Sequence, residues 1–278
     1  MRHLSLAIVL ALACVVPASA KPVRVEFDND GRLTAIHWGD IEVVDADAPE
    51  PVIRYLGDNF EGRWDENAGT LHYKASRASA KIAVEPGDDR LRLVLEITNT
   101  TDAVIEDTSK RRDQKIGEIF ALSLAGWQFE KGPAFIDPRY SGWIKNAELK
   151  DARGFDRRIS YPGWGYAPVT ACWDNRYTVG VSCHEPTIPY LYIRAWEHGN
   201  DPFRIQFDLR DPIEPGETLR REFIVTFADS GDWQTTLTPY KEFLHKTWPA
   251  VKLRNPGPFH HTYTRREHFN KETKFYKP

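Results

Sequence analysis

The sequence has little cysteine, one methionine and no long apolar segment beyond its first twenty residues. Of its three cysteines, only Cys172 and Cys183 lie outside that first segment. A turn at 174–176 would place Cys172 opposite a residue near position 178, several positions from Cys183. A disulfide needs Cα atoms within about 7 Å of each other. We therefore expect two free thiols.

Several motifs of enzymes and binding proteins are also absent. The chain has no G-x-S-x-G nucleophile elbow, no phosphate-binding loop and no dinucleotide fingerprint, so we expect no cofactor. Its net charge of −3 lacks the basic excess of a nucleic-acid-binding protein. Three histidines near the C-terminus, His260, His261 and His268, have no cysteine or fixed carboxylate beside them, and we expect no metal site there.

The first twenty residues have the pattern of an export signal. Arg2 gives a positive start, the segment 4–16 is apolar, and Ala18-Ser19-Ala20 supplies small residues at a cleavage site. Cys14 offers a lipoprotein alternative, but the residues before it do not match a lipobox. We predict a signal peptide over 1–20, cleavage after Ala20 and a secreted or periplasmic protein. No second apolar stretch is long enough for a membrane span.

The rest of the chain alternates apolar and polar residues as half-buried strands do. In 90–98, Leu91, Leu93 and Leu95 would share one face, with Arg92 and Glu96 opposite. Similar runs occur at 22–28, 32–38, 41–46, 70–75, 80–85, 118–124, 168–173, 177–183, 189–196, 203–209 and 218–228. Turn residues separate these runs. The pattern predicts an all-β protein, a large antiparallel sandwich over 21–230.

One helical pattern follows the strands, at 231–249. Asp232 suits the N-cap, and Trp233, Leu237 and Leu244 recur at helical spacing. Pro239 predicts either a kink or a restart capped by Thr238. The basic tail 250–278 has few aliphatic residues, and its composition predicts poor order.

The segment 99–168 combines long connections with many aromatic residues. Loops of this length are commonly functional or held by their own packing. Flat rings with polar edges suit the apolar faces and polar rims of sugars. The carbohydrate-binding candidates are Tyr140, Trp143, Tyr161, Trp164, Tyr166 and Arg157. The alternative is that these rings fill the rim of the sandwich.

The catalytic candidates are few. His184 and Glu185 are adjacent, so on a strand their side chains would point to opposite faces and could not act on one atom together. Asp137 is one of several acids in the aromatic-rich region, and no spacing pairs it with a second carboxylate. A strand end at Pro186 explains His184 and Glu185 without catalysis.

Three segments together resemble a known domain. They are "SYPG" with the following "APVTACWDNRYTVGVSCHE", the passage 116–143 with Pro138 and Gly142, and the helical segment 231–249. This combination resembles the N-terminal galactose-mutarotase-like β-supersandwich of large exported glycoside hydrolases, with His184-Glu185 where a His-Asp dipeptide is more usual. In those enzymes the catalytic residues lie on a (β/α)₈ barrel after the helix, and no barrel follows here.

The resemblance implies a carbohydrate-associated β-supersandwich that is not catalytic alone. Its expected partners are an oligo- or polysaccharide and a separate catalytic barrel protein. One alternative is a sugar-active enzyme, an aldose epimerase or glycoside hydrolase that uses His184, Glu185 or Asp137 for proton transfer. A second alternative is a truncated structural domain with no ligand.

Overall fold

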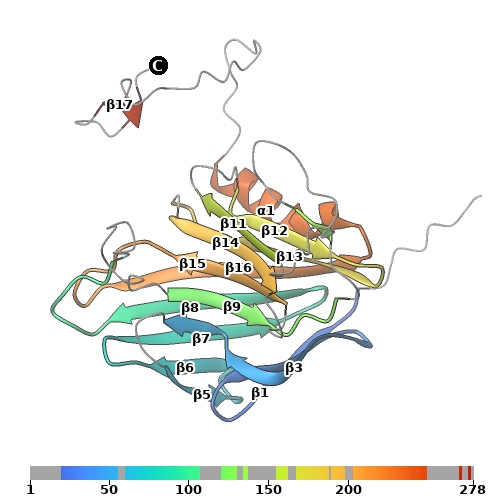
Figure 1. Ribbon diagram of the computed structural model, residues 1–278, viewed down its shortest axis with the longest axis horizontal. Helices are drawn as coiled ribbons and strands as arrows, with labels where there is room; N and C mark the ends of the chain where they lie inside the picture. Colours follow the sequence, from blue (N-terminus) through green and yellow to red (C-terminus); the bar gives the residue numbers. More distant parts are fainter. Residues whose placement is uncertain are drawn as a thin grey trace, which may run out of the picture.

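The computed structural model describes most of the chain after position 19. The described residues are 20–55, 60–106, 120–129, 134–136, 155–161, 167–187, 189–197, 203–248, 269–270 and 275–276. Most of them lie in antiparallel strands (Figure 1).

The larger of the two main sheets has eight strands in the order β10-β12-β13-β16-β8-β7-β6-β5. These strands are β5 (Glu61–Asp65), β6 (Thr70–Lys74), β7 (Ala78–Pro86), β8 (Arg90–Asn99), β10 (Ala134–Phe135), β12 (Val169–Trp173), β13 (Tyr177–Cys183) and β16 (Thr218–Asp229).

The second main sheet has five strands in the order β11-β14-β15-β9-β4. Its strands are β4 (Ile53–Tyr55), β9 (Phe120–Ala125), β11 (Phe155–Tyr161), β14 (Leu191–Glu197) and β15 (Arg204–Leu209). Figure 1 shows β9, β14 and β15 in front of the strands of the eight-stranded sheet.

The hydrophobic core lies between these two sheets. Leu93 and Phe223 reach it from β8 and β16, and Phe207 reaches it from β15. The rings of Phe207 and Phe223 meet edge to face at 5.3 Å between centroids. Because side chains alternate along each strand, every second residue enters this core, as the sequence pattern predicts. The structure thus confirms the predicted antiparallel β-sandwich.

A smaller sheet at the N-terminal end joins β1 (Val23–Phe27), β2 (Arg32–Trp38) and β3 (Ile41–Pro51). Asp89 ties the start of this segment to the sandwich. Its carboxylate accepts hydrogen bonds from the backbone nitrogen of Lys21 at 2.9 Å and from Nε1 of Trp38 at 2.7 Å. The Lys21 ammonium lies 3.6 Å from the centroid of the Trp38 ring. In the C-terminal tail, β17 (Phe269–Asn270) pairs with β18 (Phe275–Tyr276).

Helix α1 (Trp233–Thr247) packs against β12, β13 and β16 on the side away from the core. The predicted N-cap is confirmed, because Asp232 accepts a hydrogen bond from the backbone nitrogen of Thr235. The helix continues through the buried Pro239, so Thr238 starts no second helix. Gly180 allows the close approach of helix and sheet. A Cβ atom at that position would lie 2.6 Å from Thr236.

Several strands differ from the sequence prediction. β4, β5, β10 and β11 were not expected, and β3 extends beyond 46 to Pro51. Cys172 and Cys183 are free and buried, as expected. Cys172 pairs with Val179 in the register of β12 and β13, four positions away from Cys183. Within the described part of the chain, no helix is long and apolar enough to cross a membrane.

Candidate functional site

The five-stranded sheet turns a set of nine polar and aromatic side chains away from the core, five of them buried and four half-buried. We call this set the polar face; it comprises Arg54, Ser123, Tyr192, Arg194, Trp196, Arg204, Gln206, Asp208 and Arg210. Strand β15 shows its origin, because Arg204, Gln206 and Asp208 alternate with the core residues Ile205 and Phe207. All three polar side chains are at most 3% exposed. Charged side chains are rarely buried unless they are paired. This face therefore differs from an ordinary solvent-exposed surface.

An ion pair stands at one end of the polar face. Arg204 donates from Nη1 and Nη2 to the two carboxylate oxygens of Glu50, at 2.6 and 2.5 Å. Its Nη1 also donates to Oγ of Ser123 at 2.9 Å. The hydrogen bond from Arg204 lowers the pKa of Glu50, although partial burial opposes the shift. The Glu50 carboxyl is therefore ionised at neutral pH.

Arginines stack on the aromatic rings of β14. The guanidinium carbons of Arg204 and Arg194 lie 4.9 and 5.3 Å from the centroid of the Trp196 ring. That of Arg210 lies 3.8 Å from the Tyr192 centroid. Stacking fixes the plane of a guanidinium and leaves its N–H edge available for hydrogen bonds. The polar face thus places arginine side chains against aromatic rings.

Some polar atoms of this face have no partner within the described residues. Gln206 donates to Asp208 at 2.5 Å, but its own Oε1 is buried without a hydrogen bond there. The Nε1 atom of Trp196 and the Nε atom of Arg204 are likewise buried and unpaired among the described residues. Unpaired buried polar atoms cost free energy in a folded protein. A bound molecule with donors and acceptors would satisfy them.

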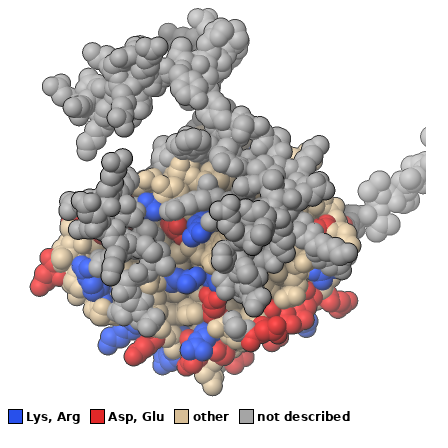
Figure 2. Space-filling model, in the orientation of Figure 1, with Lys and Arg blue, Asp and Glu red and all other residues tan. Residues whose placement is uncertain are grey.

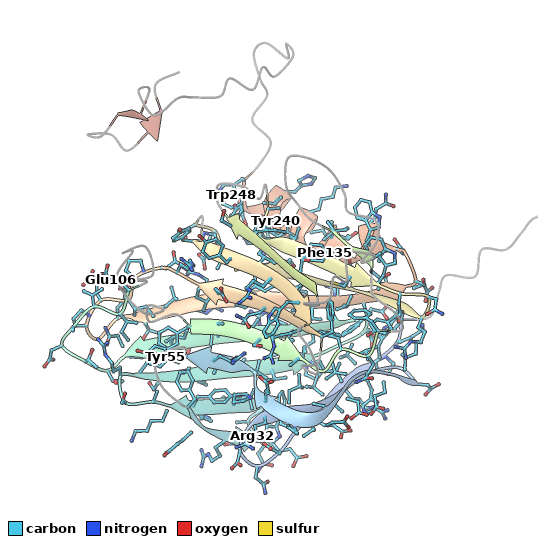
Figure 3. All side chains as sticks on the ribbon, in the orientation of Figure 1. Arg32, Tyr55, Glu106, Phe135, Tyr240 and Trp248 are labelled. Carbon is cyan, nitrogen blue, oxygen red and sulfur yellow. The ribbon has the colours of Figure 1, made fainter. Side chains whose placement is uncertain are left out.

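A cleft adjoins the polar face at β4. Its volume is about 590 Å³, within the range of small-molecule sites. Arg54 belongs to both this cleft and the polar face, Glu50 lines the cleft and pairs with Arg204, and the aromatic residues Tyr55 and Phe60 also line it. Figure 3 labels Tyr55 beside the sheets and Arg32, another lining residue, at the lower edge.

The surface view shows charged groups at this position. In Figure 2, basic and acidic atoms lie next to one another in the middle of the visible face, where Figure 1 places β9, β14 and β15. Mixed charge is consistent with the paired arginines and carboxylates of the polar face.

His184 lies elsewhere, under helix α1. Its ring packs against Tyr240 and Phe243 at centroid distances of 5.7 and 4.9 Å, and its Nε2 lies 2.9 Å from Oγ of Ser182. Burial lowers the pKa of His184 to about 4, and Arg92 adds to this effect while Glu222 opposes it. The imidazole is therefore neutral at physiological pH. Figure 3 shows Tyr240 at the helix, at the opposite end of the molecule from Arg32.

Glu185 points the other way, toward Arg221. It accepts a hydrogen bond from this guanidinium at 3.2 Å, and Arg221 also pairs with Asp211 at 2.8 Å. Arg221 shares its side of β16 with the core residues Phe223 and Val225, whereas helix α1 lies on the other side. Adjacent residues thus diverge, as the period of two predicts, and the pair has no common target.

The other predicted site residues are only partly described. Tyr161 ends β11, is half-buried, and shares a hydrogen bond with the hydroxyl of Tyr240. Arg157 is placed by its backbone alone, opposite Ala195 of β14. The remaining candidates, Asp137, Tyr140, Trp143, Trp164 and Tyr166, lie outside the described residues and stay predictions. Among the described residues, no group of three or more His, Cys, Asp or Glu could hold a metal ion.

The polar face itself was not foreseen. Its signal in the sequence is the strand R-I-Q-F-D-L at 204–209, flanked by charged and aromatic residues of β14. A single alternating strand does not reveal whether its polar side faces solvent or a site. The burial of all three polar side chains of β15 makes that distinction, and the pairing with β14 sets Trp196 opposite Arg204.

Comparisons with known proteins gave matches among solved structures alone. No protein-family model and no curated protein matches the chain. Similar solved structures include a protein from Synechocystis sp. PCC 6803, at 10% identity, with 76% of this chain and 93% of that chain covered and a TM-score of 0.49. A galactose mutarotase related enzyme from Lactobacillus acidophilus matches at 9% identity, with coverages of 77% and 97% and a TM-score of 0.44.

An α-N-acetylgalactosaminidase from Bifidobacterium bifidum matches at 10% identity with a TM-score of 0.49. This match covers 84% of the present chain but only 39% of the enzyme, so the chain spans about two fifths of that protein.

Proposed function

We propose that this chain is an exported carbohydrate-binding β-sandwich that binds sugar on its polar face and is not catalytic alone. One observation carries the proposal. The donor Nε1 of Trp196 and the acceptor Oε1 of Gln206, on neighbouring strands, are both buried, and neither has a hydrogen-bond partner among the described residues. A sugar hydroxyl can accept from the first and donate to the second. The indole of Trp196 also offers the apolar surface that a sugar ring contacts.

Two observations support a binding role over catalysis. His184 and Glu185 point apart, and each is engaged with other protein groups. The carboxylate of Glu50 is held by Arg204 and so is not poised to accept a proton from a substrate. Export is proposed because residues 1–20 have the pattern of a signal peptide. A separate catalytic barrel protein is the proposed partner, because the sequence resembles the domain that precedes such a barrel in glycoside hydrolases.

The test is binding of residues 21–278 to a broad panel of neutral and acidic glycans. Trp196→Phe removes the indole N–H and keeps a ring for the arginines to stack on, so we expect weaker binding with the fold intact. Trp248→Phe is the matched control, because Trp248 is 43% exposed and lies after helix α1, away from the polar face.

Binding that Trp196→Phe leaves unchanged would place the site elsewhere. In that case Trp143→Ala and Trp164→Ala, run beside it, test the loop aromatics predicted from the sequence. Sugar release or anomer interconversion by the wild-type chain, measured on the same panel, would contradict the non-catalytic part of the proposal.

A further inference from the structure

We propose that the carbohydrate bound at the polar face is an oligosaccharide of at least two sugar units, which extends from this face into the cleft beside β4. One unit contacts Trp196, and the next lies in the cleft. This inference rests on the proposed function and adds a second subsite to it.

The polar face and the cleft are connected through Arg204. Its guanidinium carbon lies 4.9 Å from the centroid of the Trp196 ring, and its nitrogens donate to both carboxylate oxygens of Glu50. Glu50 lines the cleft. One side chain thus joins the ring of the first subsite to the wall of the second, and a bound chain that follows Arg204 passes from one to the other.

The two subsites are too far apart for a single sugar unit. Trp196 belongs to β14, and the strands of this sheet follow in the order β14, β15, β9 and β4. Neighbouring strands lie about 4.8 Å apart, so β14 and β4 are separated by about 14 Å. A pyranose ring is narrower than this distance. A ligand that reaches both Trp196 and the cleft beside β4 therefore has at least two units.

The cleft has room for a further unit. Its volume is about 590 Å³, in the range of sites that bury most of a small molecule. The two atoms assigned to the first unit, Trp196 Nε1 and Gln206 Oε1, lie on adjacent strands and so suit one sugar ring. The rest of the oligosaccharide then occupies the cleft.

The wall of the cleft combines a fixed aromatic ring with a carboxylate. Phe60 is partly buried and lines the cleft. Its ring packs against three others, those of Tyr55, Tyr73 and Phe120, at centroid distances of 6.0, 5.8 and 6.1 Å. This packing holds the ring as a rigid apolar surface for a sugar ring. Glu61 in the same wall is exposed, makes no hydrogen bond or ion pair with the described residues, and can accept hydrogen bonds from sugar hydroxyls.

The experiment is calorimetric titration of residues 21–278 with gluco-, galacto- and xylo-oligosaccharides of one to five units. The same lengths of any other glycan that binds in the panel above are included. We expect the affinity for the bound series to rise about tenfold from one unit to three, a gain of about 1.4 kcal/mol. An added aromatic contact supplies a gain of this order.

Two variants locate the second subsite. Phe60→Leu removes the ring from the cleft wall and keeps an apolar side chain, and it should weaken the three-unit ligand about tenfold and the single unit much less. Glu61→Ala changes an exposed side chain and should likewise weaken the longer ligands more than the single unit. Phe27→Leu is the matched control, because Phe27 is also partly buried against the core and is not one of the residues that line the cleft. It should leave both affinities unchanged.

Equal affinity for one unit and for longer chains would overturn this inference and leave the proposed function standing. A rise with length that Phe60→Leu and Glu61→Ala leave unchanged would do the same, because the chain would then extend away from the cleft. Trp196→Phe should weaken every length, since it acts on the first unit. Binding that Trp196→Phe leaves unchanged, or no binding of any glycan by a chain whose fold is verified by circular dichroism, would overturn both.

Discussion

Arg204 and Glu50 are 154 positions apart in the sequence, yet they form a two-bonded ion pair with nitrogen–oxygen distances of 2.6 and 2.5 Å. The Arg204 side chain is 2% exposed and that of Glu50 is 31% exposed. This pair connects the end of β3 to β15, and so links the small N-terminal sheet to the polar face.

Removing one partner of this pair should be costly. Glu50→Gln leaves a buried guanidinium without its counter-charge, and we expect the free energy of unfolding to fall by about 2–4 kcal/mol. Urea denaturation at pH 7 measures the change. The control is Glu85→Gln, whose carboxylate pairs with Arg92 but is 53% exposed, and its cost should stay below about 1 kcal/mol. Equal losses in the two variants would contradict a structural role for the buried pair.

Stability should depend on pH through His184. Because its pKa in the folded protein, about 4, lies below the ordinary value of 6.5, the unfolded chain binds a proton first. His184 therefore contributes full stability above pH 6.5, and this contribution is lost as the pH falls from 6.5 to 4.

Replacing the imidazole should remove that part of the pH dependence. His184→Phe keeps a ring against Tyr240 and Phe243, so the fold should persist. Thermal melts of both proteins at intervals between pH 4 and 7 measure the slope. If the variant loses stability over this interval as steeply as the wild type, a group other than His184 is responsible.

The contact between helix α1 and β13 depends on Gly180. In Gly180→Ala the new methyl group would overlap Thr236, with a Cβ–Cβ distance of 2.6 Å before relaxation. We expect a loss of about 1–3 kcal/mol, the usual cost of overpacking. Gly87→Ala is a matched control, because its Cβ would meet nothing closer than 3.8 Å. Guanidinium denaturation of both variants compares the losses. A Gly180→Ala protein as stable as Gly87→Ala would show that the helix shifts freely.

The proposed cleavage after Ala20 changes the bond between Lys21 and Asp89. Cleavage converts the Lys21 backbone N–H into an α-ammonium group, which would face the Asp89 carboxylate at the 2.9 Å now spanned by a neutral hydrogen bond. Charged hydrogen bonds contribute more than neutral ones, by about 1 kcal/mol.

Asp89→Asn should therefore destabilise a chain that begins at Lys21 by about 1 kcal/mol more than a chain that keeps residues 1–20. Asp88→Asn serves as the control, since the neighbouring Asp88 does not accept this bond. Melting temperatures of the six proteins give the comparison. An equal effect of Asp89→Asn in both lengths would show that the α-ammonium group of Lys21 does not strengthen the bond to Asp89.

Alternation of apolar and polar residues predicted most strands because the core of a sandwich imposes a period of two. The long strand β8 has the predicted pattern, with Leu91 and Leu93 buried and Arg92 outward. β4 has three residues, too few for a visible period, and β5 has only partly buried or exposed residues. The divergence of His184 and Glu185 followed from the same period. The sequence did not single out Asp208. Local sequence does not show which polar side of a strand is covered by other parts of the protein.

The polar face combines residues of β4, β9, β14 and β15. Such a surface has no counterpart in an unfolded or half-folded chain, so a molecule that recognises it binds the native state alone. By mass action, a ligand present at a hundred times its dissociation constant would add about 2.7 kcal/mol to the free energy of unfolding. If the chain binds a carbohydrate as proposed, the bound ligand would then also protect the folded protein from proteolysis.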